Sequence, residues 1–104
     1  MVHSSRPSWT FLTNHTHVLV CLVRDSEMLM RQIAQEVGIT ERQVINIISE
    51  LTEAGVVTKT RDGRRNLYDV NLDCELRHPL EAPSTVGDLL NKIIQKPLSG
   101  TKSP

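Results

Sequence analysis

Three side chains on one predicted helix carry the hydrogen-bonding groups needed to read the edges of DNA bases. Arg42, Gln43 and Asn46 lie in the stretch ERQVINIISELTE, whose apolar residues recur at helical spacing. A guanidinium can bond guanine through two hydrogen bonds, and a primary amide can bond adenine in the same way. Thr40, at the predicted start of the helix, is placed to bind a phosphate through its hydroxyl and the N–H groups of the first turn. These residue types therefore indicate recognition of double-stranded DNA.

A second group of polar residues follows directly in the stretch VVTKTRDGRRNLYDVN. This stretch predicts a β-hairpin over about 57–70, because β-branched residues flank the turn dipeptide Asp62-Gly63. Near the tip are four basic residues against one acid, a local charge of +3. Positive charge beside a reading helix suits contact with the flanking phosphates. The basic residues predicted to contact DNA are Lys59, Arg61, Arg64 and Arg65.

Two short helices joined by a tight turn must position the reading side chains. Between residues 31 and 38, apolar residues fall at helical spacing, and Gly38 then ends the first helix. Thr40, with Gln43 three residues later, predicts a capping box at the start of a second helix over about 40–54. The buried face of that helix is predicted to consist of Val44, Ile47, Ile48 and Leu51. A helix-turn-helix followed by a basic hairpin is a winged helix-turn-helix.

The remaining segments complete one small domain. We expect a first helix from a cap at Asn14 to about Arg24, apolar almost all round and therefore central in the core. A short strand is expected at 27–29, pairing with the wing. A last helix is expected to begin with a capping box at Thr85 and Asp88 and to end before Pro97. The predicted fold class is α+β, mainly α: a three-helix core, a β-hairpin wing and an extra C-terminal amphipathic helix.

The expected division of the chain follows from these elements. Residues 1–8 and 97–104 are expected to be flexible tails, 9–78 the winged helix-turn-helix domain, 79–84 a connector and 85–96 a C-terminal dimerisation helix. The apolar face predicted to hold a homodimer together is Val86, Leu89, Leu90, Ile93 and Ile94. The sequence leaves open whether this helix pairs with a second copy or packs on the first helix of its own chain.

Composition narrows the function classes. At 104 residues the chain has room for one modest core. Three aromatic residues are too few for a base-stacking platform, which argues against a single-strand binder. The net charge is zero, so an attraction for DNA must come from segregated charge. There is no P-loop, no nucleotide-binding glycine-rich turn and no H-E-x-x-H, so we predict a protein that is not an enzyme and needs no cofactor.

Localisation is inferred from what the sequence lacks. The run from Val18 to Val23 is too short to span a membrane, and the first residues contain no apolar stretch of a signal peptide. Two cysteines without a secretory signal suggest reduced thiols. A cytoplasmic protein is expected.

Four residues raise the alternative of metal sensing. His17 and Cys21 are separated by four positions, as are Cys74 and His78, and together they could supply a tetrahedral zinc site. Cys21, however, lies in an apolar segment, where a thiol usually behaves as a small buried hydrophobe. No metal site is therefore predicted, and an ArsR-like metal-sensing repressor stays as an alternative.

A winged helix used for protein–protein contact is the other alternative. Zero net charge, the glutamates Glu41 and Glu50 on the recognition helix, and the additional C-terminal helix favour it. The four basic residues of the wing oppose it, because they have no evident role in an apolar interface.

Several stretches resemble small bacterial winged helix-turn-helix transcriptional regulators of the MarR-like or ArsR-like type. They are WTFLTNHTHVLVCL at 9–22, IAQEVGITERQV, TRDGRRNLYDV, LRHPLE at 76–81 and TVGDLL at 85–90. The resemblance implies a bacterial, cytoplasmic, DNA-binding regulator of transcription that acts as a homodimer. The chain is shorter than most drug-sensing MarR proteins, so a large effector pocket is not expected. The effector, the operator and the direction of regulation are not disclosed by the sequence.

Overall fold

Four helices and one β-hairpin make up the computed structural model, which describes residues 8–99. Their order along the chain is α1 (Asn14–Arg24), α2 (Met30–Val37), α3 (Glu41–Glu53), β1 (Val57–Asp62), β2 (Arg65–Val70) and α4 (Val86–Ser99). The predicted α+β, mainly helical, winged helix-turn-helix fold is confirmed. Residues 1–7 and 100–104, which make up most of the two expected tails, lie outside the described residues.

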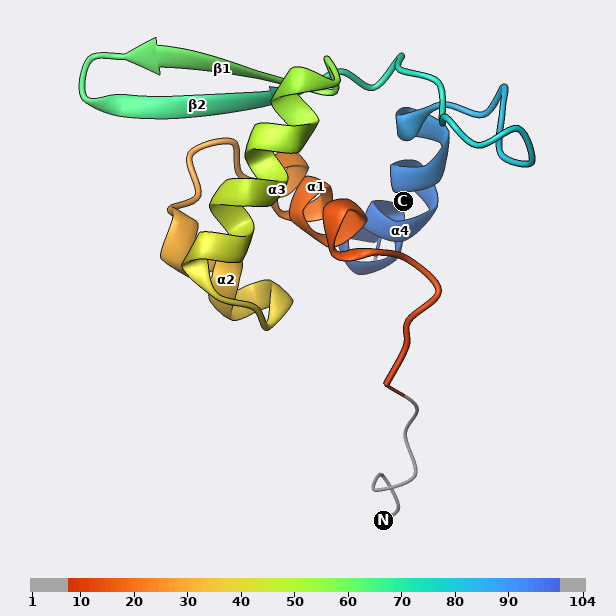
Figure 1. Cartoon of the computed structure of the whole chain (residues 1–104), viewed down its shortest axis with the longest axis horizontal. Coiled ribbons are helices and arrows are strands. Elements are labelled where there is room, and N and C mark those ends of the chain that lie inside the picture. The colour runs from red at the N-terminus through yellow and green to blue at the C-terminus, as the bar shows by residue number, and fades with distance from the viewer. Residues whose placement is uncertain (1–7, 100–104) are drawn as a thin grey trace.

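The helices enclose a single aliphatic core, with α1 in its middle. In Figure 1 the hairpin projects from one side of the helices, and α4 lies on the other side, with α1 and α3 between them. The side chains that are most completely buried come from all four helices and the base of the wing. They are Val18, Leu22, Ile33, Val44, Val57 and Leu90.

The turn between α2 and α3 follows local rules. Gly38 ends α2 with a φ of 88°, a left-handed conformation that a side chain disfavours. Its N–H donates to the carbonyl of Ala34 at 2.8 Å. Thr40 then caps α3, as predicted, with its hydroxyl accepting from the N–H of Gln43 at 3.1 Å.

The wing is an antiparallel pair whose turn differs by one residue from the prediction. The register runs from Val57 opposite Val70 to Asp62 opposite Arg65. The two turn residues are therefore Gly63 and Arg64, and not Asp62 and Gly63. Gly63 has a φ of 64°, and the first residue of a tight two-residue hairpin turn requires such a positive value.

Two predictions near α1 are wrong. Residues 27–29 form no strand, and the backbone hydrogen bond between this segment and the wing is made at Ser26, whose carbonyl accepts the N–H of Tyr68 at 3.1 Å. Leu29 already serves as the N-cap of α2, which leaves too few extended residues for a ladder. At the start of α1 the cap is Thr13, and Asn14 is the first helical residue.

The last helix begins as predicted and continues further. The N–H of Thr85 donates to Asp88 at 2.9 Å, and the N–H of Asp88 donates back to the Thr85 hydroxyl at 3.1 Å. The helix passes Pro97 and ends at Ser99, so the predicted end at 96 is wrong. A proline removes one helical hydrogen bond and crowds the carbonyl four residues earlier, which disfavours a helix, but its fixed φ lies in the helical range.

The N-terminus of α4 is bonded to the segment that leaves the wing. The N–H of Val86 donates to the carbonyl of Cys74 at 2.7 Å, and the N–H of Gly87 donates to the carbonyl of Leu72 at 2.8 Å. A Cβ added at Gly87 would lie 2.9 Å from the Leu72 carbonyl oxygen, so glycine is required for this approach. Among the helices of residues 8–99, none is long and apolar enough to cross a membrane.

Candidate nucleic-acid interface

One exposed face of α3 points away from the core. Arg42, Ile45, Asn46 and Ser49 are all exposed, and their spacing of i, i+3, i+4 and i+7 places them side by side. We call these four residues the reading face. Ile45 is 53% exposed, although it is a large apolar residue. It is not among the side chains that the sequence singled out. The sequence did contain a signal for this residue: Ile45 is apolar but lies outside the predicted buried positions 44, 47, 48 and 51, so it was to be expected on the exposed side of the helix.

Gln43 is engaged elsewhere. Its side-chain oxygen accepts from the N–H of Thr40 at 2.9 Å and from the Thr40 hydroxyl at 3.2 Å. The side-chain oxygen is therefore occupied, and only the NH₂ group remains for another partner. A two-bond contact of Gln43 with adenine would require the capping box to open. The hydroxyl of Thr40 is held in the same box.

Two of the three glutamates of α3 lie outside the reading face. Glu50 points to the flank of α3 away from the wing and pairs with His15, whose Nε2 lies 2.6 Å from its Oε1. Glu41 is exposed in the first turn of α3, where a negative charge interacts favourably with the helix dipole. Neither residue belongs to the reading face.

The basic residues of the wing divide between its two faces. Strand alternation places Lys59 and Arg61 on the same face as the buried residues Val57 and Tyr68. Arg65 lies on the opposite face, where its guanidinium forms an ion pair with Glu27. Lys59, Arg61 and Arg64 are exposed, and none of the three is in an ion pair with another residue of the described range.

A groove of about 470 Å³ separates α3 from the wing. Ile45 and Ser49 of the reading face form one wall, and Lys59 and Tyr68 of the wing form the other. Burial raises the pKa of the Tyr68 phenol, so it stays protonated and uncharged at neutral pH. The reading face and the positive charge of the wing therefore border one hollow. Its other lining residues are Met30, Ile48, Thr52 and Glu53.

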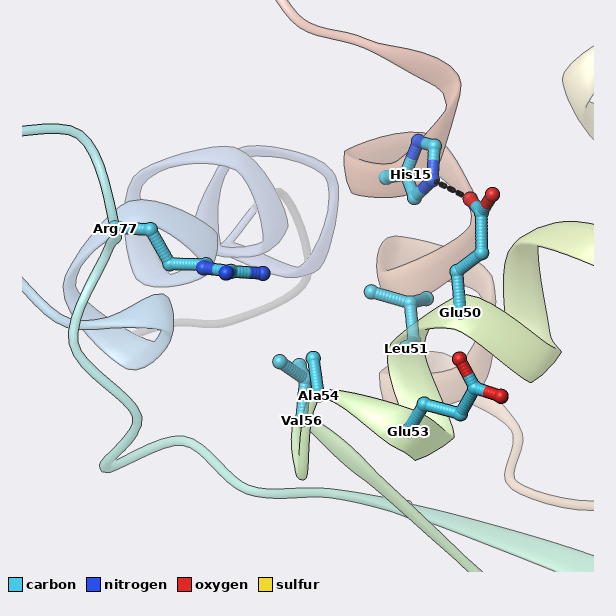
Figure 2. Close-up of a pocket in the computed structure, with 7 residues that line it drawn as sticks. All are labelled: His15, Glu50, Leu51, Glu53, Ala54, Val56 and Arg77. Atoms are coloured by element: carbon cyan, nitrogen blue, oxygen red, sulfur yellow. Dashed lines mark hydrogen bonds and ion pairs between the residues drawn. The ribbon is translucent and has the colours of Figure 1, made fainter.

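A second cavity, of about 580 Å³, lies on the opposite flank of α3 (Figure 2). Arg77, from the segment after the wing, extends its guanidinium toward the His15–Glu50 pair in this view. Positive and negative side chains line the cavity together, and Glu50 already has a partner. The remaining lining residues are Leu51, Glu53, Ala54 and Val56.

Three of the four candidate zinc ligands form hydrogen bonds with separate partners. His17 bonds Asn14 at 3.0 Å, the Cys74 thiol bonds the carbonyl of Gly55 at 3.5 Å, and His78 accepts the N–H of Leu80 at 3.0 Å. Cys21 is buried, and this burial raises the pKa of its thiol. Within residues 8–99, no group of three or more His, Cys, Asp or Glu side chains is placed to hold a metal ion.

The residues expected to form a dimer interface differ in burial. Val86 and Leu90 are 4% and 1% exposed, so both are already covered by the core of the same chain. Leu89, Ile93 and Ile94 are half-buried. α4 therefore packs on its own domain and leaves part of its apolar face accessible.

Comparison with solved structures places this architecture among known winged-helix regulators. The PcaV transcriptional regulator from Streptomyces coelicolor, solved with its natural ligand, is 22% identical with a TM-score of 0.53. The match covers 88% of this chain and 64% of that one, so this chain spans less than two thirds of its length. The zinc-dependent MarR family transcriptional regulator AdcR, solved in the Zn(II)-bound state, is 15% identical with a TM-score of 0.51. That match covers 94% of this chain and 67% of that one.

These likenesses show a MarR-type fold. A search of curated proteins gives no match. A family model described as a domain of unknown function, DUF7343, matches residues 11–71, which is more than half of the chain. The chain therefore belongs to the DUF7343 family.

Proposed function

We propose that this protein is a sequence-specific, double-stranded DNA-binding regulator of transcription. In this proposal α3 enters the major groove and the wing lies against the flanking backbone. The observation that carries it is the reading face of α3 beside a wing with three exposed basic side chains, Lys59, Arg61 and Arg64. The fold shared with the two transcriptional regulators supports the same function.

In this proposal α3 and the wing have different roles. Arg42 and Asn46 can make paired hydrogen bonds to base edges, which supply specificity. The wing side chains can neutralise phosphates, which supplies affinity without sequence preference. Among the residues first predicted, Thr40 and Gln43 are now assigned to hold the start of α3 in place. Arg65 is assigned to a secondary contact, because it is paired with Glu27.

We further propose that the protein acts as a homodimer. Two copies would place their α3 helices about 34 Å apart, one turn of DNA, and would bind a palindromic site. The accessible apolar residues Leu89, Ile93 and Ile94 of α4 support this assembly.

We also propose a cytoplasmic location. The cysteines Cys21 and Cys74 are both unbridged, which suits a reducing cytoplasm.

Fluorescence anisotropy of a labelled generic duplex, titrated at a series of salt concentrations, tests DNA binding. We expect a log–log slope of several units, because each neutralised phosphate contributes about 0.9. Changing Lys59, Arg61 and Arg64 together to Gln should remove up to about 2.7 from this slope. Lys59→Gln alone should remove up to about 0.9, and Lys92→Gln is its matched control, because it removes one positive charge from an exposed position on α4.

A protein-interaction module is the second candidate function. Trp9 and Phe11 are 60% and 92% exposed and contact each other edge to face, with ring centroids 5.0 Å apart. Exposed aromatic rings are typical of protein-binding surfaces. If the folded protein binds no duplex even at low salt, the proposal of DNA binding is wrong and a partner protein becomes the target of the search.

A further inference from the structure

We propose that Ile45 determines sequence preference by contacting the C5-methyl group of a thymine in the major groove. This inference rests on the proposed DNA-binding function and deepens it, because it assigns a specific base to a residue outside the hydrogen-bonding set. It requires α3 to be the element that contacts the bases. It also predicts that the preferred DNA sequence contains an A·T pair at the position that Ile45 contacts.

The position of Ile45 on α3 is the first support. The side chain is 53% exposed and lies between Arg42, one turn earlier, and Ser49, one turn later. Isolated exposed hydrophobes are common on protein surfaces. Ile45, however, is the apolar member of an otherwise polar face, and any ligand that Arg42 and Asn46 touch must lie against it.

The surroundings of Ile45 are the second support. It borders the groove between α3 and the wing, and Lys59 lies on the opposite wall. A partner seated there would meet an apolar side chain and an exposed positive charge together, with Glu53 as the acidic residue of the lining. DNA presents both complements at once, because its backbone is anionic and the thymine methyl is the apolar group of the major groove.

The capping box narrows the bases that α3 can read. Because the Gln43 oxygen is occupied by Thr40, Asn46 is the one amide side chain of α3 free to bond adenine through two hydrogen bonds. Ile45 is its immediate neighbour in the chain. The reading face is therefore suited to guanine through Arg42, adenine through Asn46 and thymine through Ile45.

Replacing thymine by deoxyuridine tests the contact, because this change removes the methyl group and keeps every hydrogen-bonding group. The preferred duplex is first selected from a random library with the full chain, and each thymine is then replaced in turn. At one position we expect wild-type affinity to fall about fourfold, the value of one buried methyl-sized group. Ile45→Ala should bind the thymine duplex about fourfold more weakly and should not distinguish thymine from deoxyuridine at that position.

Control variants separate this contact from general weakening. Leu80→Ala truncates an apolar side chain that is 90% exposed, outside the proposed DNA interface, and should keep the full sensitivity to deoxyuridine. Ile45→Ala should unfold at the same temperature as the wild type, because the side chain is exposed and leaves no internal cavity.

The possible results distinguish failure of the Ile45–thymine contact from failure of the proposed DNA-binding function. If no deoxyuridine substitution weakens the wild type, or if Ile45→Ala remains equally sensitive, the assignment of Ile45 is wrong and DNA binding stands. Salt-dependent binding without any sequence preference overturns the assignment of Ile45 and the sequence specificity of the proposed function, and leaves only general DNA binding. Failure to bind any duplex at low salt overturns the DNA-binding function and this inference together.

Discussion

Arg42 is the strongest hydrogen-bond donor on the reading face, since its guanidinium offers five N–H groups in a fixed plane. Arg42→Ala should relax discrimination at one base pair by about 1–3 kcal/mol. Selection of preferred sites from a random library, run in parallel for both proteins, checks this. An unchanged preference would remove Arg42 from the residues that read bases.

Thr40 and Gln43 act on α3 through their reciprocal bonds. Thr40→Ala should lower the free energy of unfolding by about 1 kcal/mol, because one N–H of the first turn loses its acceptor. A fall in the melting temperature of about 4–8 °C is the corresponding signal for a domain of this size.

Thr40→Ser is the control for the cap, since serine keeps the accepting oxygen and should retain most of the stability. If Thr40→Ala instead melts at the wild-type temperature but binds DNA less tightly, the hydroxyl acts on phosphate, as the sequence alone suggested. Calorimetry and anisotropy on the same samples distinguish the two roles.

The turn between α2 and α3 depends on one backbone conformation. Gly38→Ala should cost about 1–2 kcal/mol, because a side chain disfavours its φ of 88°. A Cβ there would meet no atom within 4 Å, so the cost is that of the backbone alone. Urea denaturation measures it. Gly38→Asn should lose less, and equal losses in the two variants would contradict a conformational cause.

The Arg65–Glu27 pair connects the wing to the segment before α2. Glu27→Gln should leave Arg65 available to phosphate and tighten duplex binding by about 0.2–1 kcal/mol, the range for surface pairs. Anisotropy at low salt is the measurement. Glu36→Gln, an equal change of charge at an exposed position on α2, should have less effect. Equal effects would mean that net charge, and not the release of Arg65, is responsible.

The elements defined by short-range patterns were predictable. Each of these patterns depends on residues within two helical turns of one another. They are the buried face at positions 44, 47, 48 and 51, the capping boxes at Thr40 and Thr85, and the helix end at Gly38. Because these patterns involve only neighbouring residues and no long-range contacts, they could be recognised in the sequence. They identified α2, α3 and the start of α4.

Features set by distant contacts were not predictable in the same way. A strand at 27–29 requires backbone pairing across the fold, and the one backbone hydrogen bond observed there runs from the N–H of Tyr68 to the carbonyl of Ser26. Arg65 looked equivalent to Arg64 until Glu27, distant in sequence, was placed beside it. Gln43 illustrates a different limit, because it satisfied two patterns, a cap and a base reader, and its single oxygen serves one of them at a time.

At the scale of the whole molecule, the proposed homodimer depends on α4. Among residues 8–99, the half-buried side chains packed against the core include Ile93 and Ile94 but not Leu89. Leu89→Glu should therefore convert the dimer to a monomer without loss of fold, because it places a charge in the proposed interface. Sedimentation velocity at micromolar concentration is the measurement.

Asn91→Glu is the matched control for assembly, because it adds a charge at an exposed position of the same helix. It should leave the dimer intact. A wild-type monomer at this concentration, or a Leu89→Glu variant that still dimerises, would contradict the interface.

The close approach at Gly87 has a mechanical consequence. Backbone hydrogen bonds join α4 to Leu72 and Cys74, and Asn71 is bonded in turn to Val56 at the base of the wing. These bonds fasten the start of α4 to the base of the hairpin through residues 71–74. A substitution at Gly87 that pushes α4 away from Leu72 should therefore also disturb the base of the wing.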